Sequence, residues 1–265
     1  MVIKSSTIFF FTALILISFF ILLILIDKKG GNYDFTKNLE KRISSAHFVY
    51  FMERDDKVDT VFQEEYFEWL LNQLKIEYNE KIVYYKLKTR KQIQEITGIE
   101  ANACVYQQDS GSYAIYTILP IDNHECVHLV LGKNTGSPPQ LFNEGAAVAY
   151  QAYLVDNKFI PSWNGDDFHI LARDYYFNNN LPTIDSLLTN DSFWRIDPEI
   201  TYPVTGSFIR YLIDTFGIDQ FKEFVYISDF FDSDSTIRTN FHSVYNNKID
   251  SAWNEWIGFI EQYSM

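Results

Sequence analysis

Residues 121–131 read Ile121-Asp122-Asn123-His124-Glu125-Cys126-Val127-His128-Leu129-Val130-Leu131. Their apolar spacing predicts a helix over 121–131 that ends at Gly132-Lys133-Asn134. Ser137-Pro138-Pro139-Gln140 then predicts the start of a second helix, with Ser137 as the N-cap and proline in the first turn. The break between the two helices lets the second fold back against the first.

The first helix contains an H-E-x-x-H motif, His124-Glu125-Cys126-Val127-His128. At 3.6 residues per turn, His124 and His128 share one face, so both imidazoles can reach a Zn²⁺ ion at about 2.0–2.1 Å. Glu125 lies beside them, near enough to hold a water on the metal without binding the metal itself. A catalytic zinc takes three protein ligands, and Glu144, one turn into the second helix, is the predicted third. The alternative is a helix whose histidines are only solvated or hydrogen-bonded.

The motif, with Glu144 in Asn143-Glu144-Gly145 after fifteen intervening residues, resembles the gluzincin zinc metallopeptidases of the peptidase MA-like superfamily. The resemblance implies His124, His128 and Glu144 as ligands of one zinc ion per chain and Glu125 as general base. It also implies a zincin-like fold, in which the strand 113–119 is the edge strand along the substrate cleft. The stretch 202–212 resembles the helix start that follows the third ligand in such enzymes.

Tyr202 is the candidate catalytic donor to the oxyanion, because gluzincins often use a downstream tyrosine there. An ordinary packing role for Tyr202 remains an equal alternative. The chain departs from the gluzincin pattern at Val148, where some members have an aspartate, and it lacks the Gly-x-Met-Glu-Asn sequence of the aminopeptidases. An endopeptidase is therefore expected.

The composition describes one sizeable globular domain. The chain has 265 residues, 47% of them hydrophobic, and a formal net charge of −13. So acidic a chain is a poor partner for nucleic acid, and none is expected. Strand and helix patterns alternate up to Pro120, and helices are predicted afterwards at 166–177, 203–216, 219–229 and 250–262. We therefore expect an α+β fold with a mixed first part and a mainly helical second part.

The N-terminus is expected to be separate from this domain. Residues 8–26 contain no charge, glycine or proline, and as a helix they would span roughly 28 Å, close to the thickness of a bilayer core. This favours a transmembrane anchor over 1–29, or an uncleaved signal, with a tether at 30–33 and the peptidase-like domain over 34–265. A membrane localisation with the domain outside the cytoplasm is the expectation, and a cleaved signal peptide is the alternative.

Other residues carry weaker signals. Cys104 and Cys126 could form a disulfide or remain two buried thiols. His169 is either a donor near the cleft or a surface residue of its helix. The aspartates at 229, 232 and 234 lack the spacing of an EF-hand and are expected on the surface.

The predicted function is a zinc peptidase that hydrolyses peptide or protein substrates. One alternative is a non-hydrolytic zinc-containing surface protein that binds a partner, although such a protein needs no general base at Glu125. Another is a hydrolase of a different amide or ester. The oligomeric state is left open.

Overall fold

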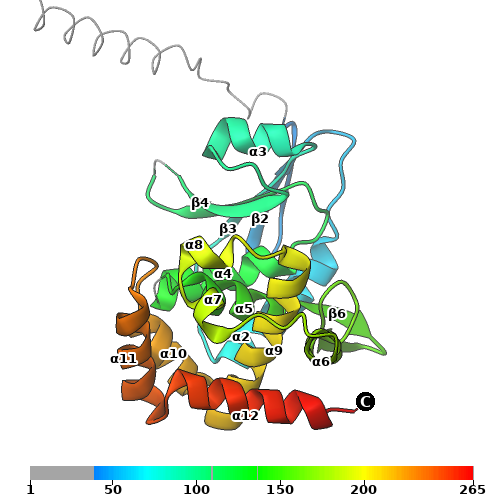
Figure 1. The fold of residues 1–265 in the computed structure, drawn as a ribbon. Coiled ribbons are helices and arrows are strands. Elements are labelled where there is room, and N and C mark those ends of the chain that lie inside the picture. The colour runs from blue at the N-terminus through cyan, green and yellow to red at the C-terminus, as the bar shows by residue number, and fades with distance from the viewer. Residues whose placement is uncertain (1–38, 109, 136, 265) are drawn as a thin grey trace, which may run out of the picture.

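The computed structural model describes residues 39–108, 110–135 and 137–264, in which a five-stranded sheet packs on a body of helices (Figure 1). The first part comprises β1 (Lys41–Ser44), β2 (Phe48–Met52), α2 (Thr60–Leu74), β3 (Ile82–Lys86), α3 (Arg90–Thr97), β4 (Ala103–Gln107) and β5 (Tyr113–Thr117). The second part comprises α4 (Asn123–Thr135), α5 (Gln140–Tyr150), β6 (Ala152–Val155), β7 (Lys158–Pro161), α6 (Phe168–Phe177), α7 (Ile184–Leu188), α8 (Asn190–Phe193), α9 (Pro198–Phe216), α10 (Ile218–Ile227), α11 (Asp234–Tyr245) and α12 (Ile249–Gln262). The expected α+β class, mixed first and mainly helical afterwards, is confirmed.

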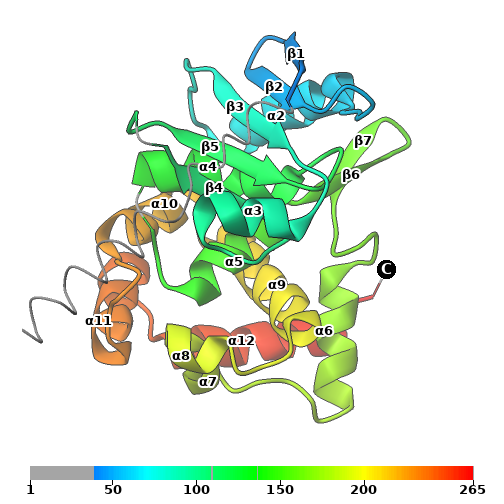
Figure 2. The same ribbon diagram turned by 90° about the horizontal axis from the view of Figure 1, so that it is seen from above.

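The sheet is mixed, with strand order β1-β2-β3-β5-β4. The central pairs β2–β3 and β3–β5 are parallel, and the outer pairs β1–β2 and β4–β5 are antiparallel. Alternation along β2 buries Phe48, Tyr50 and Met52 in the main core, together with residues of α2 and α4. A smaller apolar cluster on β3, β4 and β5 is covered by Ile93 of α3 (Figure 2). The sheet is therefore covered on both faces.

The edge strands of the sheet are β1 and β4, which corrects the expectation for residues 113–119. β5 pairs with β3 on one side and with β4 on the other, so it is interior. Just beyond the two ends of β4, the N–H of Ile118 donates to the carbonyl of Asn102, and the N–H of Gln108 donates to the carbonyl of Ser112. Because hydrogen-bonded pairs alternate along an antiparallel ladder, the even-numbered residues of β4 are the ones that bond β5. Odd-numbered residues such as Val105 therefore turn their backbone N–H and C=O groups to the free edge.

Helices α5 and α9 cross at two glycines, which lets their backbones approach closely. A Cβ atom on Gly145 would lie 2.6 Å from Ile209 Cγ1 and 2.9 Å from the carbonyl oxygen of Thr205. A Cβ atom on Gly206 would lie 2.8 Å from Val148 Cβ. Both are closer than atoms pack, so only glycine permits this crossing. Gly145, directly after Glu144, therefore admits α9 at close range.

Gly206→Ala is expected to lower the free energy of unfolding by about 1–3 kcal/mol, because the added methyl overpacks the α5–α9 crossing. The matched control is Gly258→Ala in α12, where an added Cβ meets nothing within 4 Å. This control should be neutral or gain up to about 1 kcal/mol from helix propensity. Urea unfolding of the three proteins measures both effects. Equal stability of the two variants would contradict the close crossing.

Several element boundaries differ from those the sequence predicts. α4 continues through Gly132 to residue 135, and α9 begins at Pro198 rather than near Tyr202. Pro203 lies inside α9, where its missing N–H leaves the carbonyl of Glu199 without a helical partner. That carbonyl accepts the hydroxyl of Tyr175 at 2.9 Å instead. The Tyr175 hydroxyl of α6 therefore permits Pro203 within α9, although the local sequence around this proline indicates a helix start.

Several elements were not predicted: β1, the β6–β7 hairpin, the short helices α7 and α8, and the 12-residue helix α11. The hairpin turns at Asp156 and Asn157, both with positive φ, which is the conformation of a tight two-residue turn. Tyr153-Leu154-Val155 before this turn is a strand signal that could have been recognised.

The expected membrane localisation is corrected by the structure. None of the helices among the described residues is both long and apolar enough to cross a bilayer. Even α9, with 19 residues, includes Glu199, Arg210 and Asp214. Residues 8–26, on which the expectation depended, lie outside the described residues, as do the predicted 1–29 segment and the 30–33 tether.

Candidate metal centre

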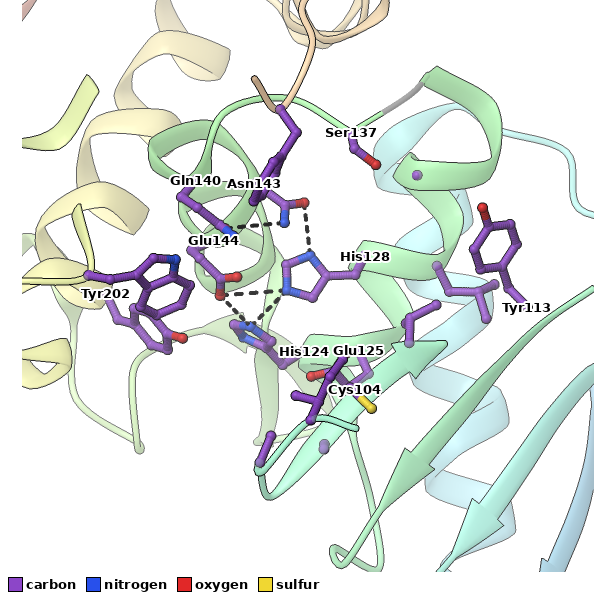
Figure 3. Close-up of a pocket in the computed structure, with 18 residues that line it drawn as sticks. Cys104, Tyr113, His124, Glu125, His128, Ser137, Gln140, Asn143, Glu144 and Tyr202 are labelled. Carbon is purple, nitrogen blue, oxygen red and sulfur yellow. Dashed lines mark hydrogen bonds and ion pairs between the residues drawn. The ribbon is translucent and has the colours of Figure 1, made fainter. Parts of the chain in front are cut away.

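Two neighbouring helices bring the three predicted ligands together (Figure 3). The Nε2 atoms of His124 and His128 on α4 lie 3.1 Å apart. Oε2 of Glu144 on α5 lies 3.1 Å from the first and 3.6 Å from the second. A tetrahedral ion bound at 2.0–2.1 Å separates its ligand atoms by about 3.3 Å. The three atoms are therefore spaced as three corners of a zinc tetrahedron, and this donor set fits the ion.

Each imidazole is oriented by an amide on its far side. His124 Nδ1 lies 3.1 Å from Oε1 of Gln151, and His128 Nδ1 lies 3.1 Å from Oδ1 of Asn143. An amide oxygen only accepts hydrogen bonds, so each Nδ1 carries a proton, and Nε2 is the ring nitrogen that faces Glu144 and could bind a metal. Such outer contacts orient metal-binding histidines. Both rings thus have the tautomer that a metal at Nε2 requires.

The first turn of α4 is fixed by its neighbours. Asp122 accepts the N–H of Glu125 at 3.0 Å, as an N-cap does. Tyr66 donates to the carbonyl of Asn123 at 3.0 Å, and the Asn123 amide donates to the carbonyl of Ala152 at 2.6 Å. The helix that bears the motif therefore starts in one defined position between α2 and β6.

Glu125 is buried beside the histidines. Its carboxylate and the two imidazoles have ligand atoms all within 4.8 Å of one another. The shorter distances from Glu144 make Glu144 the better third ligand, which leaves Glu125 free for a proton. Burial, and then the charge of Asp122, raise the pKa of Glu125 to about 8, while a hydrogen bond from the Val105 backbone opposes that rise. Edge strand β4 thus orients this carboxylate.

The charges within the centre offset one another. Burial alone would raise the pKa of Glu144, but His128 and His124 outweigh burial and hold that pKa well below its ordinary range. Burial lowers the pKa of His128, but the Glu144 carboxylate outweighs burial, so the pKa of His128 lies above its ordinary value. Glu144 is therefore an anion, which is the form a metal binds.

Tyr202 lies over His124 from the second turn of α9. The two rings stack with centroids 5.8 Å apart, and Trp163 packs edge-on against Tyr202 at 5.0 Å. Burial, the charge of Glu144 and a hydrogen bond to that carboxylate raise the pKa of the Tyr202 hydroxyl well above its ordinary value. The hydroxyl therefore keeps its proton and remains a donor beside the centre.

The centre opens into a cleft of about 500 Å³, a size usual for ligand sites. The cleft is lined on one side by Ala103, Cys104 and Val105 of edge strand β4. His124, Glu125, His128, Glu144 and Tyr202 all contribute to its lining (Figure 3). All five predicted site residues therefore share one cavity, which runs beside the free edge of a strand.

His169 is neither a cleft donor nor a surface residue. It is buried between α6, α9 and α12, where its Nδ1 lies 2.8 Å from Oγ of Ser207. Trp256 donates to the same Oγ at 2.9 Å. His169 therefore holds helices together, away from the metal centre.

Burial lowers the pKa of His169 to about 4, with smaller effects from Asp167, Asp214 and Arg210. Above pH 6.5 the ring is neutral in both folded and unfolded chains. As the pH falls from 6.5 to 4, the unfolded chain binds the proton and the folded chain does not, so stability is lost across this window. At pH 4.5 this loss should reach about 2 kcal/mol. Urea unfolding at pH 7 and 4.5 should show a smaller loss in His169→Gln, and an equal loss would contradict this role.

The two cysteines are free and buried, so the structure contains separate thiols rather than the disulfide. Cys126 lies in the main core, where Gln63 contacts its Sγ at 3.3 Å. Cys104 belongs to the small cluster beneath α3. The two side chains thus lie on opposite faces of the sheet.

Some residues of the site were not predicted. Gln151 and Asn143 orient the histidines, and Asn190, Trp194 and Phe230 shape the cleft. Asn143 directly precedes Glu144, so its place on the same helix could have been recognised. Gln151 is the C-cap of that same helix, two turns after Glu144. Asn190, Trp194 and Phe230 come from distant segments, and only the fold brings them to the centre.

In comparisons with known proteins, neither a family model nor a curated protein matches this chain. The resemblance to gluzincins therefore rests on the sequence motif alone.

Proposed function

We propose that this protein is a zinc-dependent peptidase, with His124, His128 and Glu144 as ligands and Glu125 as general base. The observation that supports it best is the spacing of the three ligand atoms, 3.1, 3.1 and 3.6 Å, with both histidines in the tautomer that presents Nε2. The order of the sheet, with an antiparallel edge strand β4 beside the motif helix, supports the zincin-like fold. A purely structural histidine pair needs neither feature.

When bound, a zinc ion would supply a Lewis acid that activates water and polarises a carbonyl group. Glu125 takes the proton from the attacking water and passes it to the amine that leaves. The Tyr202 hydroxyl donates a hydrogen bond to the carbonyl oxygen as negative charge develops there. The outward N–H and C=O groups of β4, apart from the Val105 N–H that bonds Glu125, hold an extended peptide beside these groups by strand addition.

Cleavage within a chain is the proposed mode. Among the lining residues whose side chains the structure describes, none is lysine or arginine, so none pairs with a terminal carboxylate. The acidic residues of that lining are Glu125 and Glu144, and both are already assigned roles at the centre. A substrate terminus therefore finds no free charge in the described lining, whereas the interior of a peptide needs none.

The test combines metal analysis with peptide hydrolysis. About one zinc per chain is expected, and peptides blocked at both ends should be cut in a reaction that a chelator stops and added zinc restores. Zinc bound without hydrolysis of any peptide would favour a binding protein. Hydrolysis of other amides or esters in place of peptides would assign a different hydrolase.

A further inference from the structure

Two aromatic side chains of the cleft lining come from segments remote from the motif. Trp194 ends α8, and Phe230 lies in the loop between α10 and α11, yet both line the same cleft as Glu125 and His128. Trp194 is half-exposed and Phe230 half-buried. Neither side chain is enclosed by the core, so both leave apolar surface open to whatever enters the cleft. We call this pair the aromatic wall.

The side chain of Asn190 connects the aromatic wall to the helix that carries the third predicted ligand. Asn190 donates its amide N–H to the carbonyl of Phe230 at 2.5 Å, and its Oδ1 accepts the N–H of Gln140 at 3.1 Å. Gln140 begins α5, the helix on which Asn143 contacts His128. The wall is therefore fixed against the helix that supplies the third ligand.

The loop that presents Phe230 is itself held by hydrogen bonds. Asp229 accepts the N–H of Phe231 at 2.9 Å, and Asp232 accepts the N–H of Asp229 at 2.9 Å. Asn240 of α11 donates to the carbonyl of Ile227 at 3.1 Å. These aspartates act as turn residues. Phe230 is therefore presented by a braced loop, and Phe231 beside it is 86% exposed.

The chemistry of the surrounding lining limits what can bind there. Leu129 and Ile99 add aliphatic surface to the two aromatic rings. The charged groups of the described lining belong to the metal centre, so an acidic side chain finds no partner at the wall. Unpaired burial of a charge is costly, whereas burial of an apolar side chain is favourable.

We propose that the aromatic wall is the specificity site of this protein, where Trp194 and Phe230 bind one bulky apolar side chain of a peptide in the cleft. This deepens the proposed peptidase function and rests on it for the statement that the bound peptide is cut. Asn190 is a positioning residue, which acts on the bound side chain through Phe230.

The test measures peptide binding without turnover, in the full chain carrying Glu125→Gln. Labelled peptides blocked at both ends, identical except for a single Phe, Leu, Gly or Asp, are titrated by fluorescence anisotropy. The Phe and Leu peptides should bind about 10-fold or more tightly than the Gly peptide, and the Asp peptide most weakly. Phe230→Ala and Trp194→Ala should each reduce this preference, whereas the matched control Phe231→Ala should keep it. Asn190→Ala should reduce it partly.

Thermal unfolding of every variant shows that it is folded, and half-exposed Trp194 gives a second variant should Phe230→Ala fail to fold. The specificity site would be overturned if the Glu125→Gln protein bound the Phe and Leu peptides no more tightly than the Gly peptide. It would also be overturned if both Phe230→Ala and Trp194→Ala kept the preference for the apolar peptides. Equal losses in Phe231→Ala and Phe230→Ala would do the same. Peptides that bind with the expected preference but are never cut by the wild type count against the peptidase alone. Cutting without preference counts against the wall alone.

Discussion

Glu125→Gln is expected to reduce the kcat of peptide hydrolysis by about 10²–10⁴-fold, the usual contribution of a general base. Glutamine keeps the size of the side chain and can still meet the Val105 backbone, but it cannot accept a proton from water. Because Glu144 and the two histidines are the ligands, zinc content should stay at the wild-type value. The measurement is kcat with a blocked peptide, together with metal analysis of the same preparations.

Two comparisons make this result specific. Glu68→Gln removes a carboxylate from an exposed position of α2, so both activity and zinc content should be unchanged. Glu144→Gln should instead lower the zinc content, because it removes the anionic ligand. Loss of zinc in Glu125→Gln with zinc retained in Glu144→Gln would exchange the roles of the two glutamates. Full activity in Glu125→Gln would place the base elsewhere and remove the main support for hydrolysis.

The parts of the site that the sequence predicts are those that depend on local geometry. His124 and His128 share a face because any α-helix places residues four apart together, and Glu144 follows because the break after α4 is short. The N-cap of α5 shows the limit of such reasoning. Ser137 was expected there, but the structure has Pro139 at the cap and no side-chain cap bond at that residue. Asn190, from a distant part of the chain, accepts the N–H of Gln140 instead.

The fold shows the same division between local and distant information. The hydrophobic patterns predict most strands of the sheet, since the alternation in β2 and the apolar run in β3 are local properties. They do not determine which strand lies at the edge, because pairing depends on the order of strands in space. The expected edge strand, 113–119, proved to be interior for this reason. Likewise, Pro203 taken alone indicates a helix start. It lies inside α9 because the hydroxyl of Tyr175, from another helix, bonds the carbonyl that the proline leaves without a partner.

Tyr202→Phe is the second variant with a large expected effect, and it separates the two roles that the sequence leaves open. If the hydroxyl donates to the developing oxyanion, its removal should lower kcat by about 10²–10³-fold, as loss of one oxyanion donor does. KM and zinc content should change little, because the phenyl ring still stacks on His124 and the ligands are intact. A purely packing tyrosine would show the opposite pattern, with kcat unchanged.

The matched control is Tyr175→Phe, which also removes one tyrosine hydroxyl from a contact with α9. That hydroxyl bonds the carbonyl left free by Pro203, and neither Tyr175 nor Glu199 lines the cleft, so its loss should cost about 1 kcal/mol of stability and leave kcat unchanged. The pair thus distinguishes a catalytic hydroxyl from a structural one on the same helix. If Tyr202→Phe loses stability but keeps its kcat, the hydroxyl serves only as a structural partner of Glu144, and the oxyanion donor must be sought among other groups that line the cleft.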